Sequence, residues 1–366
     1  MRFTLIILLS VVFALPVCAQ RIDSIAYASS PLFESEEVFE IVLKGDVRKL
    51  FKDRRDKPKY HSFILSYELQ DERYSLPVRL KTRGHFRKKR ENCYTPPLLL
   101  NFDKLPNLAK TIFIGQNKLK LVTSCIHEKY VLREYLAYKI YQLITPKSFC
   151  VRLVKVTFED TSRNKVITAK YGIILEDQNK LATRNNSSIR KQLELNPELI
   201  EKDEFLKMSV FQYLIGNTDW SIQYLHNIKI INDNEDSSLY AVPYDFDMSG
   251  IVNTPYALPA EALLLKSVRD RRYRGYCIED MGDFESTFKT FNVLKEDIYA
   301  IYENNSLIDK TYQKRTLKYL DKFYETIWDE KISRSEFQYP CKPNGTGNII
   351  IKGLKKLKIK SKQNSD

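Results

Sequence analysis

The sequence has few of the residues that build zinc centres. Among 366 residues there are only six cysteines and four histidines, and no CxxC pair occurs. The scattered histidines are His61, His85, His127 and His226. Tetrahedral zinc sites use closely spaced cysteine and histidine pairs, so the common zinc patterns are excluded. The five cysteines after Cys18 are expected to be structural. Their pairing stays open, and the odd number leaves at least one free or bonded to another molecule.

Long hydrophobic runs are absent beyond the first twenty residues. Arg2 precedes an apolar core at residues 3–15, and Val17-Cys18-Ala19 follows as a small-residue cleavage site. This order predicts a secretory signal peptide over residues 1–19, cleaved near Ala19. The alternative is an N-terminal anchor, but the run is short for a bilayer span. We therefore expect export to the periplasm or cell envelope, with no transmembrane segment in the mature chain.

Acidic residues are too few to balance the basic ones. The chain has 59 Lys and Arg against 46 Asp and Glu, a net charge of +13. Much of the excess lies in residues 339–366, a basic tail with few aromatic residues to stack on bases. We expect the tail to be solvated or weakly attracted to membranes. No nucleic-acid partner is expected, because the basic residues form no known binding motif.

Hydrophobic periodicity divides the chain into two parts, and no internal repeat is apparent. Alternating patterns predict strands at residues 38–43, 63–67, 76–83, 97–102, 118–122, 151–158 and 170–175. One helix, at residues 128–143, interrupts them. After a polar linker at residues 179–191, a helix at 201–214 and two or three helices within 283–328 are expected. This order predicts an α+β, two-lobed fold, with a β-rich lobe at 20–177, a mainly helical lobe at 178–338 and a cleft near 176–180.

The most informative stretch is residues 214–250. Two short strands, at 227–231 and 239–242, are expected to form a hairpin between polar clusters at 216–219 and 243–247. Folding this hairpin places Asn227 and Asp245 at the same end, with Asp219 on the preceding loop. Converging carboxylate and amide oxygens suit Mg²⁺, and a further Asp can accept a proton from a hydroxyl. The alternative is a hairpin whose acidic residues only stabilise turns.

A basic loop follows the predicted strand at residues 76–83. It contains Arg83 and Gly84 and continues to Arg90. A glycine after a strand lets the backbone approach a phosphate, so one interpretation of Arg83 and Gly84 is a phosphate-binding loop. The alternative is an ordinary exposed basic turn.

The two acidic clusters resemble those of the spore-coat CotH-type protein kinases and of the related HipA-type atypical kinases. The resemblance rests on Gly216-Asn217-Thr218-Asp219, on Asn227, and on Val242-Pro243-Tyr244-Asp245-Phe246-Asp247 with Gly250. Upstream, Arg83-Gly84 resembles the glycine-containing loop of these families, residues 133–141 their N-lobe helix, and residues 171–176 the strand that enters the hinge. The likeness spans residues 76–256.

The resemblance implies a two-lobed protein-kinase-like fold that binds Mg²⁺ and ATP in the cleft. Asp219 would be the catalytic Asp, and Asn227 and Asp245 would hold Mg²⁺. Asp247 would support or replace one of them, and Glu176 would lie at the hinge beside adenine.

Two departures from the family pattern concern spacing and a lysine. The interval from Asp219 to Asn227 is longer than the usual four-residue gap, and the CotH type tolerates an insert there. The strand expected to carry the phosphate-binding Lys has none at residues 98–102. Lys120, or less favourably Lys118, would substitute and pair with Glu134. Otherwise the phosphates would rest on Arg83, Arg87 and the loop backbone.

Three functions remain open at this point. The first is an exported atypical kinase that transfers phosphate from Mg²⁺-ATP to a protein hydroxyl. The second is a kinase-fold pseudoenzyme, a binding or structural protein of the cell envelope, which the missing strand lysine favours. The third is a metal-dependent hydrolase or nuclease using the same carboxylates. The absence of a His-rich metal set weighs against the third.

Overall fold

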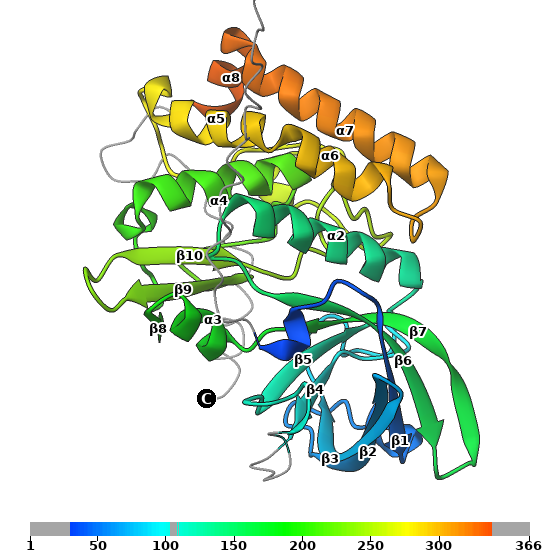
Figure 1. Ribbon diagram of the computed structural model, residues 1–366. Helices are drawn as coiled ribbons and strands as arrows, with labels where there is room; N and C mark the ends of the chain where they lie inside the picture. The colour runs from blue at the N-terminus through cyan, green and yellow to red at the C-terminus, as the bar shows by residue number, and fades with distance from the viewer. Residues whose placement is uncertain (1–29, 103–107, 109, 339–366) are drawn as a thin grey trace, which may run out of the picture.

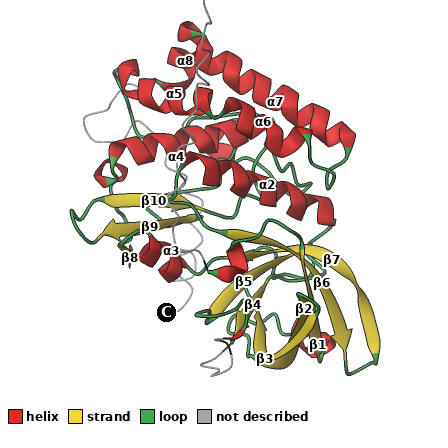
Figure 2. Ribbon diagram, viewed as in Figure 1, coloured by secondary structure: helices red, strands yellow, loops and turns green. Residues whose placement is uncertain are grey.

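The computed structural model describes residues 30–102, 108 and 110–338 (Figure 1). The predicted signal peptide and the predicted basic tail lie outside these residues. The fold is mixed α+β, with a β-rich N-terminal region followed by a mainly helical C-terminal region (Figure 2). Within the described residues, no helix has both the length and the apolar character that crossing a membrane requires.

Seven strands of the N-terminal region close into a barrel in the order β1-β2-β3-β4-β5-β7-β6. Only β1 and β6 pair in parallel, and this pairing closes the barrel. The strands are β1 (Phe39–Gly45), β2 (His61–Leu69), β3 (Glu72–Thr82), β4 (Leu98–Asn101), β5 (Lys118–Thr123), β6 (Val151–Asp160) and β7 (Lys165–Leu175).

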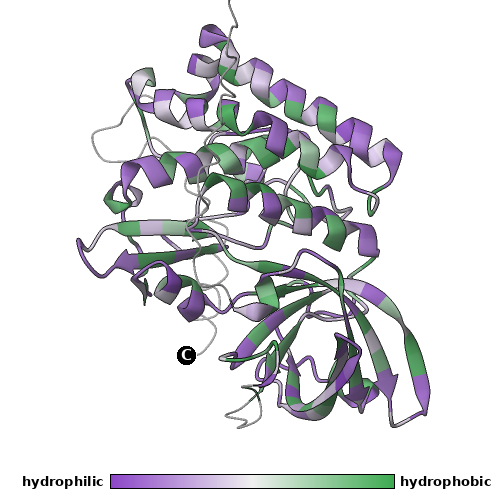
Figure 3. Ribbon diagram, in the orientation of Figure 1, coloured by the Kyte–Doolittle hydropathy of each residue, from purple (hydrophilic) through white to green (hydrophobic). Residues whose placement is uncertain are grey.

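The barrel forms because its strands alternate apolar and polar residues. In β3, Leu76, Val78 and Leu80 are buried while their neighbours face outward. Figure 3 shows the same striping on the barrel strands. The sequence pattern predicted these strands as a sheet with one helix packed on it, and did not indicate that the sheet closes. Closure adds the β1–β6 pairing and removes the exposed sheet edges, and it depends on contacts across about a hundred residues that periodicity does not encode.

In the part of the N-terminal region that the structure describes, there are two α-helices. The short α1 (Val47–Lys52) was not expected from the sequence; Asp46 caps it by accepting a hydrogen bond from the Lys49 amide. The predicted helix is α2 (Glu128–Ile144), which lies between the barrel and the C-terminal helices (Figure 1). The strand β7 is buried on both faces here. Ile174 packs inside the barrel, while Ile173 joins the core that contains α2.

The second sheet carries the predicted hairpin. Its order is β10-β9-β8, formed by β8 (Ser187–Arg190), β9 (Ile228–Asp233) and β10 (Leu239–Pro243). The expected polar linker at residues 179–191 is therefore wrong, because this segment forms α3 (Gln178–Arg184) and β8. Asp177 caps α3, and Leu181 and Ala182 are buried beneath it. Edge pairing with β9 then orders residues whose own polarity indicates a loop.

The remaining helices complete the C-terminal region. They are α4 (Lys202–Ile215), α5 (Glu285–Val293), α6 (Lys295–Glu303), α7 (Lys310–Trp328) and α8 (Glu330–Phe337). The helices expected within residues 283–328 are confirmed as α5, α6 and α7. Helix α4 contacts β10 and α5, so the hairpin rests on a helical support. Short 3₁₀ turns are η1 (Pro31–Phe33), η3 (Pro197–Leu199), η4 (Glu261–Leu263) and η5 (Met281–Phe284).

Candidate functional site

The end of the β9–β10 hairpin brings two predicted site residues together. Pro243 lies opposite Ile228 in the register, and the Tyr244 amide donates to the Asn227 carbonyl at 3.0 Å. Asn227 and Asp245 consequently leave the hairpin at the same end, as the sequence predicted. Both have left-handed backbone conformations, with φ of 51° and 65°. Such conformations in non-glycine residues are uncommon and cluster at functional sites.

Asp219 lies on the loop that joins α4 to the hairpin. Gly216 ends α4 with φ of 65°, a conformation that glycine adopts without strain. The Asn217 side chain then accepts a hydrogen bond from the Asp219 amide at 3.0 Å. Asn227 Nδ2 donates to both the Asp219 carbonyl and Asp219 Oδ2, at 2.9 and 3.1 Å. The Asp219 side chain remains 38% exposed, so a substrate can reach a carboxylate whose position is fixed.

His226 is a site residue that the sequence did not indicate. Its Nε2 lies 2.9 Å from Asp219 Oδ1, and a two-residue bridge between Ser221 and His226 closes the intervening loop. Burial lowers the pKa of His226, but Asp219 and then Asp245 outweigh burial and raise it above its usual value. The imidazole is thus biased toward the charged form beside Asp219. The sequence did not reveal the contact between His226 and Asp219, because this contact depends on the conformation of the loop between them.

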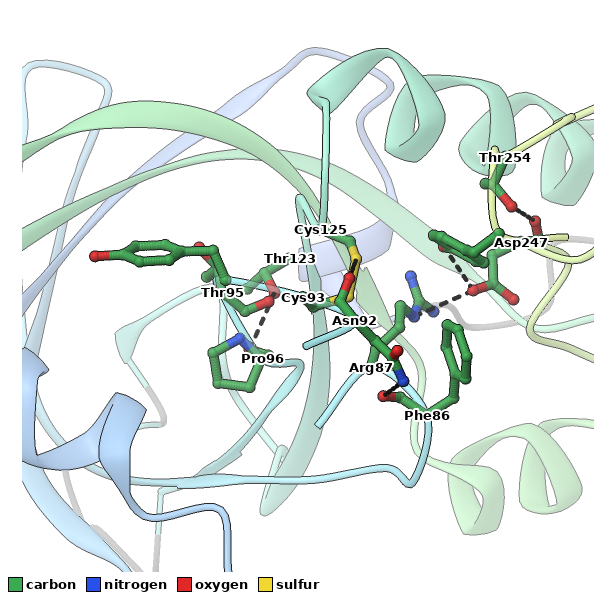
Figure 4. The surroundings of a disulfide bond; sticks show 12 residues. Phe86, Arg87, Asn92, Cys93, Thr95, Pro96, Thr123, Cys125, Asp247 and Thr254 are labelled. Carbon is green, nitrogen blue, oxygen red and sulfur yellow. Dashed lines mark hydrogen bonds and ion pairs between the residues drawn. A yellow bond between two sulfur atoms is a disulfide. The ribbon is translucent and has the colours of Figure 1, made fainter. Parts of the chain in front are cut away.

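Arg87 lies at the centre of a cluster of carboxylates from both regions of the fold. Its Nη2 is 2.9 Å from Asp245 Oδ1, its Nε is 3.2 Å from Asp247 Oδ2, and its Nη1 is 3.5 Å from Glu134 Oε2. Figure 4 shows Arg87 reaching Asp247 from its loop. The predicted pairing of Lys120 with Glu134 is therefore wrong. Glu134 is buried on the side of α2 that faces the loop after β3, and Arg87 reaches it from there.

This cluster has more negative than positive groups. Burial, and then Asp247 and Asp245, raise the pKa of Glu134 well above its ordinary value, although Arg87 opposes the shift. Burial and Asp245 likewise raise the pKa of Asp247. Burial alone would lower the pKa of Arg87, but Asp247, Glu134 and Asp245 outweigh it and raise that pKa. Three carboxyl groups thus share one guanidinium, which remains charged.

A disulfide holds the loop that carries Arg87. Cys93 in this loop is bonded to Cys125, which lies just before α2 (Figure 4). Within the loop, Asn92 Nδ2 donates to the Phe86 carbonyl at 2.9 Å. The described part of the chain leaves Cys150 as a free thiol, whereas Cys277 is also disulfide-bonded. The Cys93–Cys125 bond links the Arg87 loop to the segment just before α2, the helix that carries Glu134.

Three further cations surround Tyr244 and Asp245. Lys120 Nζ lies 4.5 Å from the centre of the Tyr244 ring, and Lys229 Nζ lies 5.3 Å from it. Burial, and then the charges of Arg83 and Lys229, lower the pKa of Lys120 to about 7. Burial also lowers the pKa of Arg83, while Asp245 opposes that shift. Lys229 was not anticipated, because it belongs to the acidic hairpin rather than to the barrel.

Two further predicted residues are Gly84, in the turn after β3, and Glu176, just after the end of β7. Gly84 is exposed with φ of 84°, and a Cβ there would meet no atom within 4 Å, so the turn and not a close packing contact requires glycine. Glu176 follows β7 at the junction of the two regions. Its carboxylate accepts hydrogen bonds from the Cys150 amide at 3.0 Å and from Arg184 Nε at 2.9 Å. The side chain of Glu176 is thus engaged within the junction itself.

The predicted metal ligands fit Mg²⁺ only in part. Among the described residues, no group of three or more His, Cys, Asp or Glu side chains is arranged to hold a metal ion. Asp245 is one-third exposed and Asn227 is half-buried, so an amide oxygen and a carboxylate are available. Mg²⁺ accepts so small a set when phosphate and water complete it. Asp247 is buried, accepts a hydrogen bond from the Tyr256 hydroxyl and forms an ion pair with Arg87, which suits holding Arg87 rather than metal.

No protein-family model and no curated protein sequence matches the chain. Among solved structures, the chain is similar to the Helicobacter pylori proinflammatory kinase CtkA, with 12% sequence identity and a TM-score of 0.33. The match covers 75% of this chain and 90% of that protein. A similarity at this level carries no inference about function.

Proposed function

We propose that the chain is an exported atypical kinase that transfers phosphate from Mg²⁺-ATP to a protein hydroxyl. One observation carries the proposal: Asp219, Asn227 and Asp245 converge at one hairpin end, facing Arg87. Arg87 in turn pairs with Glu134 of α2, so a cation is fixed between the barrel and the helical region. Phosphoryl transfer needs this combination of a proton acceptor, metal ligands and fixed cations.

In the proposed reaction, Asp219 accepts the proton of the attacking hydroxyl. The hydroxyl oxygen forms a bond to the γ-phosphorus while the bond from that phosphorus to the β–γ bridging oxygen breaks, and ADP leaves. His226 and Asn227 hold the two oxygens of Asp219 and orient it toward the acceptor. Mg²⁺, when bound, would neutralise charge on the phosphates, and Asn227 and Asp245 would hold it.

The phosphates would be bound by side chains rather than by a strand lysine of the usual kind. Arg83, Arg87 and Lys120 supply the positive charge on the barrel side, with Lys229 opposite. Because the pKa of Lys120 is about 7, an adjacent phosphate would draw a proton onto its amine. In this proposal Arg87 replaces the missing lysine, because it forms an ion pair with Glu134 of α2 and also lies next to Asp245.

Export is part of the same proposal. Disulfides persist in oxidising compartments, and the Cys93–Cys125 bond supports a periplasmic or envelope location. The predicted signal peptide, cleaved near Ala19, would provide the route. A protein of the envelope is then the proposed substrate class.

A phosphate-transfer assay tests the proposal. Residues 20–366 are incubated with ³²P-labelled ATP, Mg²⁺ and an envelope protein extract, and label on the chain and on other proteins is counted. Asp219→Asn and Asp245→Asn are expected to lose at least about a hundredfold in rate. Asp236→Asn, at the opposite end of the same hairpin, is the matched control and should retain activity. Equal labelling by all four proteins would overturn the kinase assignment.

The second candidate is a kinase-fold pseudoenzyme that binds partners in the cell envelope. The observation that favours it is the commitment of Asp245 and Asp247 to Arg87, since a metal must compete with the guanidinium there. Under this alternative, Mg²⁺-ATP raises the melting temperature of the chain but no label is transferred. Transfer that is lost in Asp219→Asn would eliminate it.

A further inference from the structure

A basic groove lies between α7 and residues 269–271, which belong to the segment before η5. It has a volume of about 530 Å³ and is lined by five basic side chains and only two acidic ones. Its basic side chains are Arg269, Arg271, Arg315, Lys318 and Lys322. None of them takes part in the proposed phosphate transfer. The groove is therefore a separate feature of the helical region.

The two acidic side chains of this groove offset only part of the charge of its five basic side chains. Asp270 accepts hydrogen bonds from the amides of Lys266 and Ser267, and Glu336 accepts one from the Tyr213 hydroxyl. Arg315, Lys318 and Lys322 follow one another along a single face of α7, at spacings of three and four residues. Within the described residues these three side chains form no ion pair, and all three are exposed.

Hydrogen bonds and ring contacts hold the two arginines at the floor of the groove. Arg271 donates to the carbonyls of Leu214 and Tyr319, and its guanidinium stacks 3.7 Å from the centre of the Tyr319 ring. Arg269 stacks on the same ring at 4.5 Å and donates to the Gly250 carbonyl at 3.3 Å. The two arginines are thus held in place before any ligand arrives, which lowers the entropy lost on binding.

The same floor contacts the loops of the candidate active site. A Cβ at Gly250 would lie 2.8 Å from Tyr319 Oη, so this ring packs directly against the segment that follows Asp247. The Gly250 amide donates to the Gly216 carbonyl at 3.0 Å, which connects this segment to the start of the Asp219 loop. An anion at the groove would therefore bind beside the back of the catalytic loops.

We propose that this groove binds a phosphate-bearing anion, through Arg269 at its floor and Arg315, Lys318 and Lys322 at its wall. Guanidinium and ammonium groups form charge-assisted hydrogen bonds with phosphate oxygens. A fixed guanidinium next to mobile lysines suits a ligand with more than one anionic oxygen. The site stands independently of the proposed kinase activity, because none of its residues belongs to the cleft.

Calorimetric titration of inorganic pyrophosphate into the full chain tests the site. The triple variant Arg315→Ala/Lys318→Ala/Lys322→Ala is expected to bind pyrophosphate at least about tenfold more weakly. The matched control Lys310→Ala/Lys314→Ala/Lys331→Ala removes the same charge from exposed positions outside the groove and should bind like wild type. Lys120→Met, which alters the cleft, should retain groove binding. This variant separates failure of the groove from failure of the kinase proposal.

Equal pyrophosphate affinity in the two triple variants would overturn the proposal. Circular dichroism shows whether each variant is folded, and the single variant Arg315→Glu provides a second reduction of charge if the triple variant unfolds. Titration with O-phosphoserine distinguishes a phosphate ester on a protein from a free polyphosphate. Binding of either probe that is lost in the groove variants supports the site, and binding of neither to wild type contradicts it.

Discussion

The carboxylate and amide side chains of the candidate site are positioned in a different way from its cations. Asp219, Asn227 and Asp245 belong to one hairpin and the loop before it, and their arrangement follows from hydrogen bonds within about thirty residues. Arg87 instead reaches the site from the barrel, on a loop that a disulfide links to the segment before α2. The acidic half of the site (Asp219, Asn227 and Asp245) is determined by contacts that are local in sequence. The basic half (Arg87 and the neighbouring cations) depends on tertiary structure.

This difference implies that the two halves respond to different perturbations. Changes to the barrel loop should affect stability and phosphate binding together, because Arg87 also neutralises buried carboxyl groups. Changes to the hairpin carboxylates should affect phosphate transfer and its dependence on Mg²⁺. Their effects on folding should be smaller, since Asp219 and Asp245 are partly exposed. The following variants separate the two halves.

The largest loss of stability is expected from Arg87→Met. It leaves Glu134 and Asp247 buried without a cation, which costs about 3 to 5 kcal/mol in unfolding free energy. Urea unfolding measures the change, and Arg90→Met, exposed in the same loop, is the control. Adding Glu134→Gln to Arg87→Met should recover part of the loss. A double variant no more stable than the single one would argue against the buried ion cluster.

Removal of the Cys93–Cys125 bond is expected to rank second. The bond closes a segment with a sequence separation of 32. Cys93→Ser/Cys125→Ser should therefore lose about 2 to 4 kcal/mol of stability. It should also weaken binding of ATP measured without Mg²⁺, because Arg87 is less well positioned. Cys150→Ser removes a thiol without opening a cross-link and serves as control. Equal ATP affinity in both variants would show that the disulfide does not position Arg87 for ATP binding.

Lys120 provides a pH-dependent test of the basic half. Its pKa of about 7 lies below the ordinary lysine value of 10.5. Near pH 8 the free protein holds this amine mostly neutral, so ATP binding should take up about one proton as the phosphates raise its pKa. Calorimetry in buffers of different ionisation enthalpy measures the uptake. Lys120→Met should abolish it, while Lys118→Met on the same strand should not; uptake unchanged in Lys120→Met would place the phosphates elsewhere.

The lowered pKa of Lys120 also predicts the direction of a stability change. Between its folded and unfolded pKa values the unfolded chain binds more protons, so this lysine destabilises the fold most at and below pH 7, and the penalty fades as the pH rises. Lys120→Met should therefore be stabilised relative to wild type near neutrality by about 1 to 2 kcal/mol, with a smaller difference near pH 10.

The smallest effect is expected at His226. Its raised folded-state pKa means that the bond to Asp219 stabilises the fold below the unfolded value and is lost as the pH rises through the folded one. Because both side chains are about one-third exposed, the contribution should stay below about 1 kcal/mol. Unfolding of His226→Gln should differ from wild type near pH 6 and not near pH 9. His85→Gln is the exposed control, and a pH-independent difference would contradict the ion pair.

The sequence predicted the hairpin end because its information is local. Alternation around residues 227–243 indicates the strands, and pairing then determines that Asn227 and Asp245 lie together. The position of Asp219 follows because Gly216 ends α4. These inferences require only periodicity, turn chemistry and the length of one loop.

The residues that the sequence did not resolve depend on contacts between distant segments. The sequence indicates Arg87 only as a second choice for binding the phosphates, because nothing in its loop indicates that its guanidinium lies 3.5 Å from Glu134. The partner of Cys93 could not be chosen from spacing alone, and the barrel requires β1 to meet β6. The segment containing α3 and β8 reads as a polar linker because pairing with β9, and not its own composition, orders it.

The most direct test of the account is whether both halves bind one Mg²⁺-ATP. ATP affinity is measured by calorimetry with Mg²⁺ and with EDTA, for wild type, Asp245→Asn and Arg87→Lys. We expect Mg²⁺ to tighten binding to wild type by about tenfold or more, with this dependence lost in Asp245→Asn. Arg87→Lys should bind more weakly under both conditions, because a lysine cannot reproduce the planar contacts of Arg87. Identical affinities with Mg²⁺ and with EDTA in wild type would contradict the account.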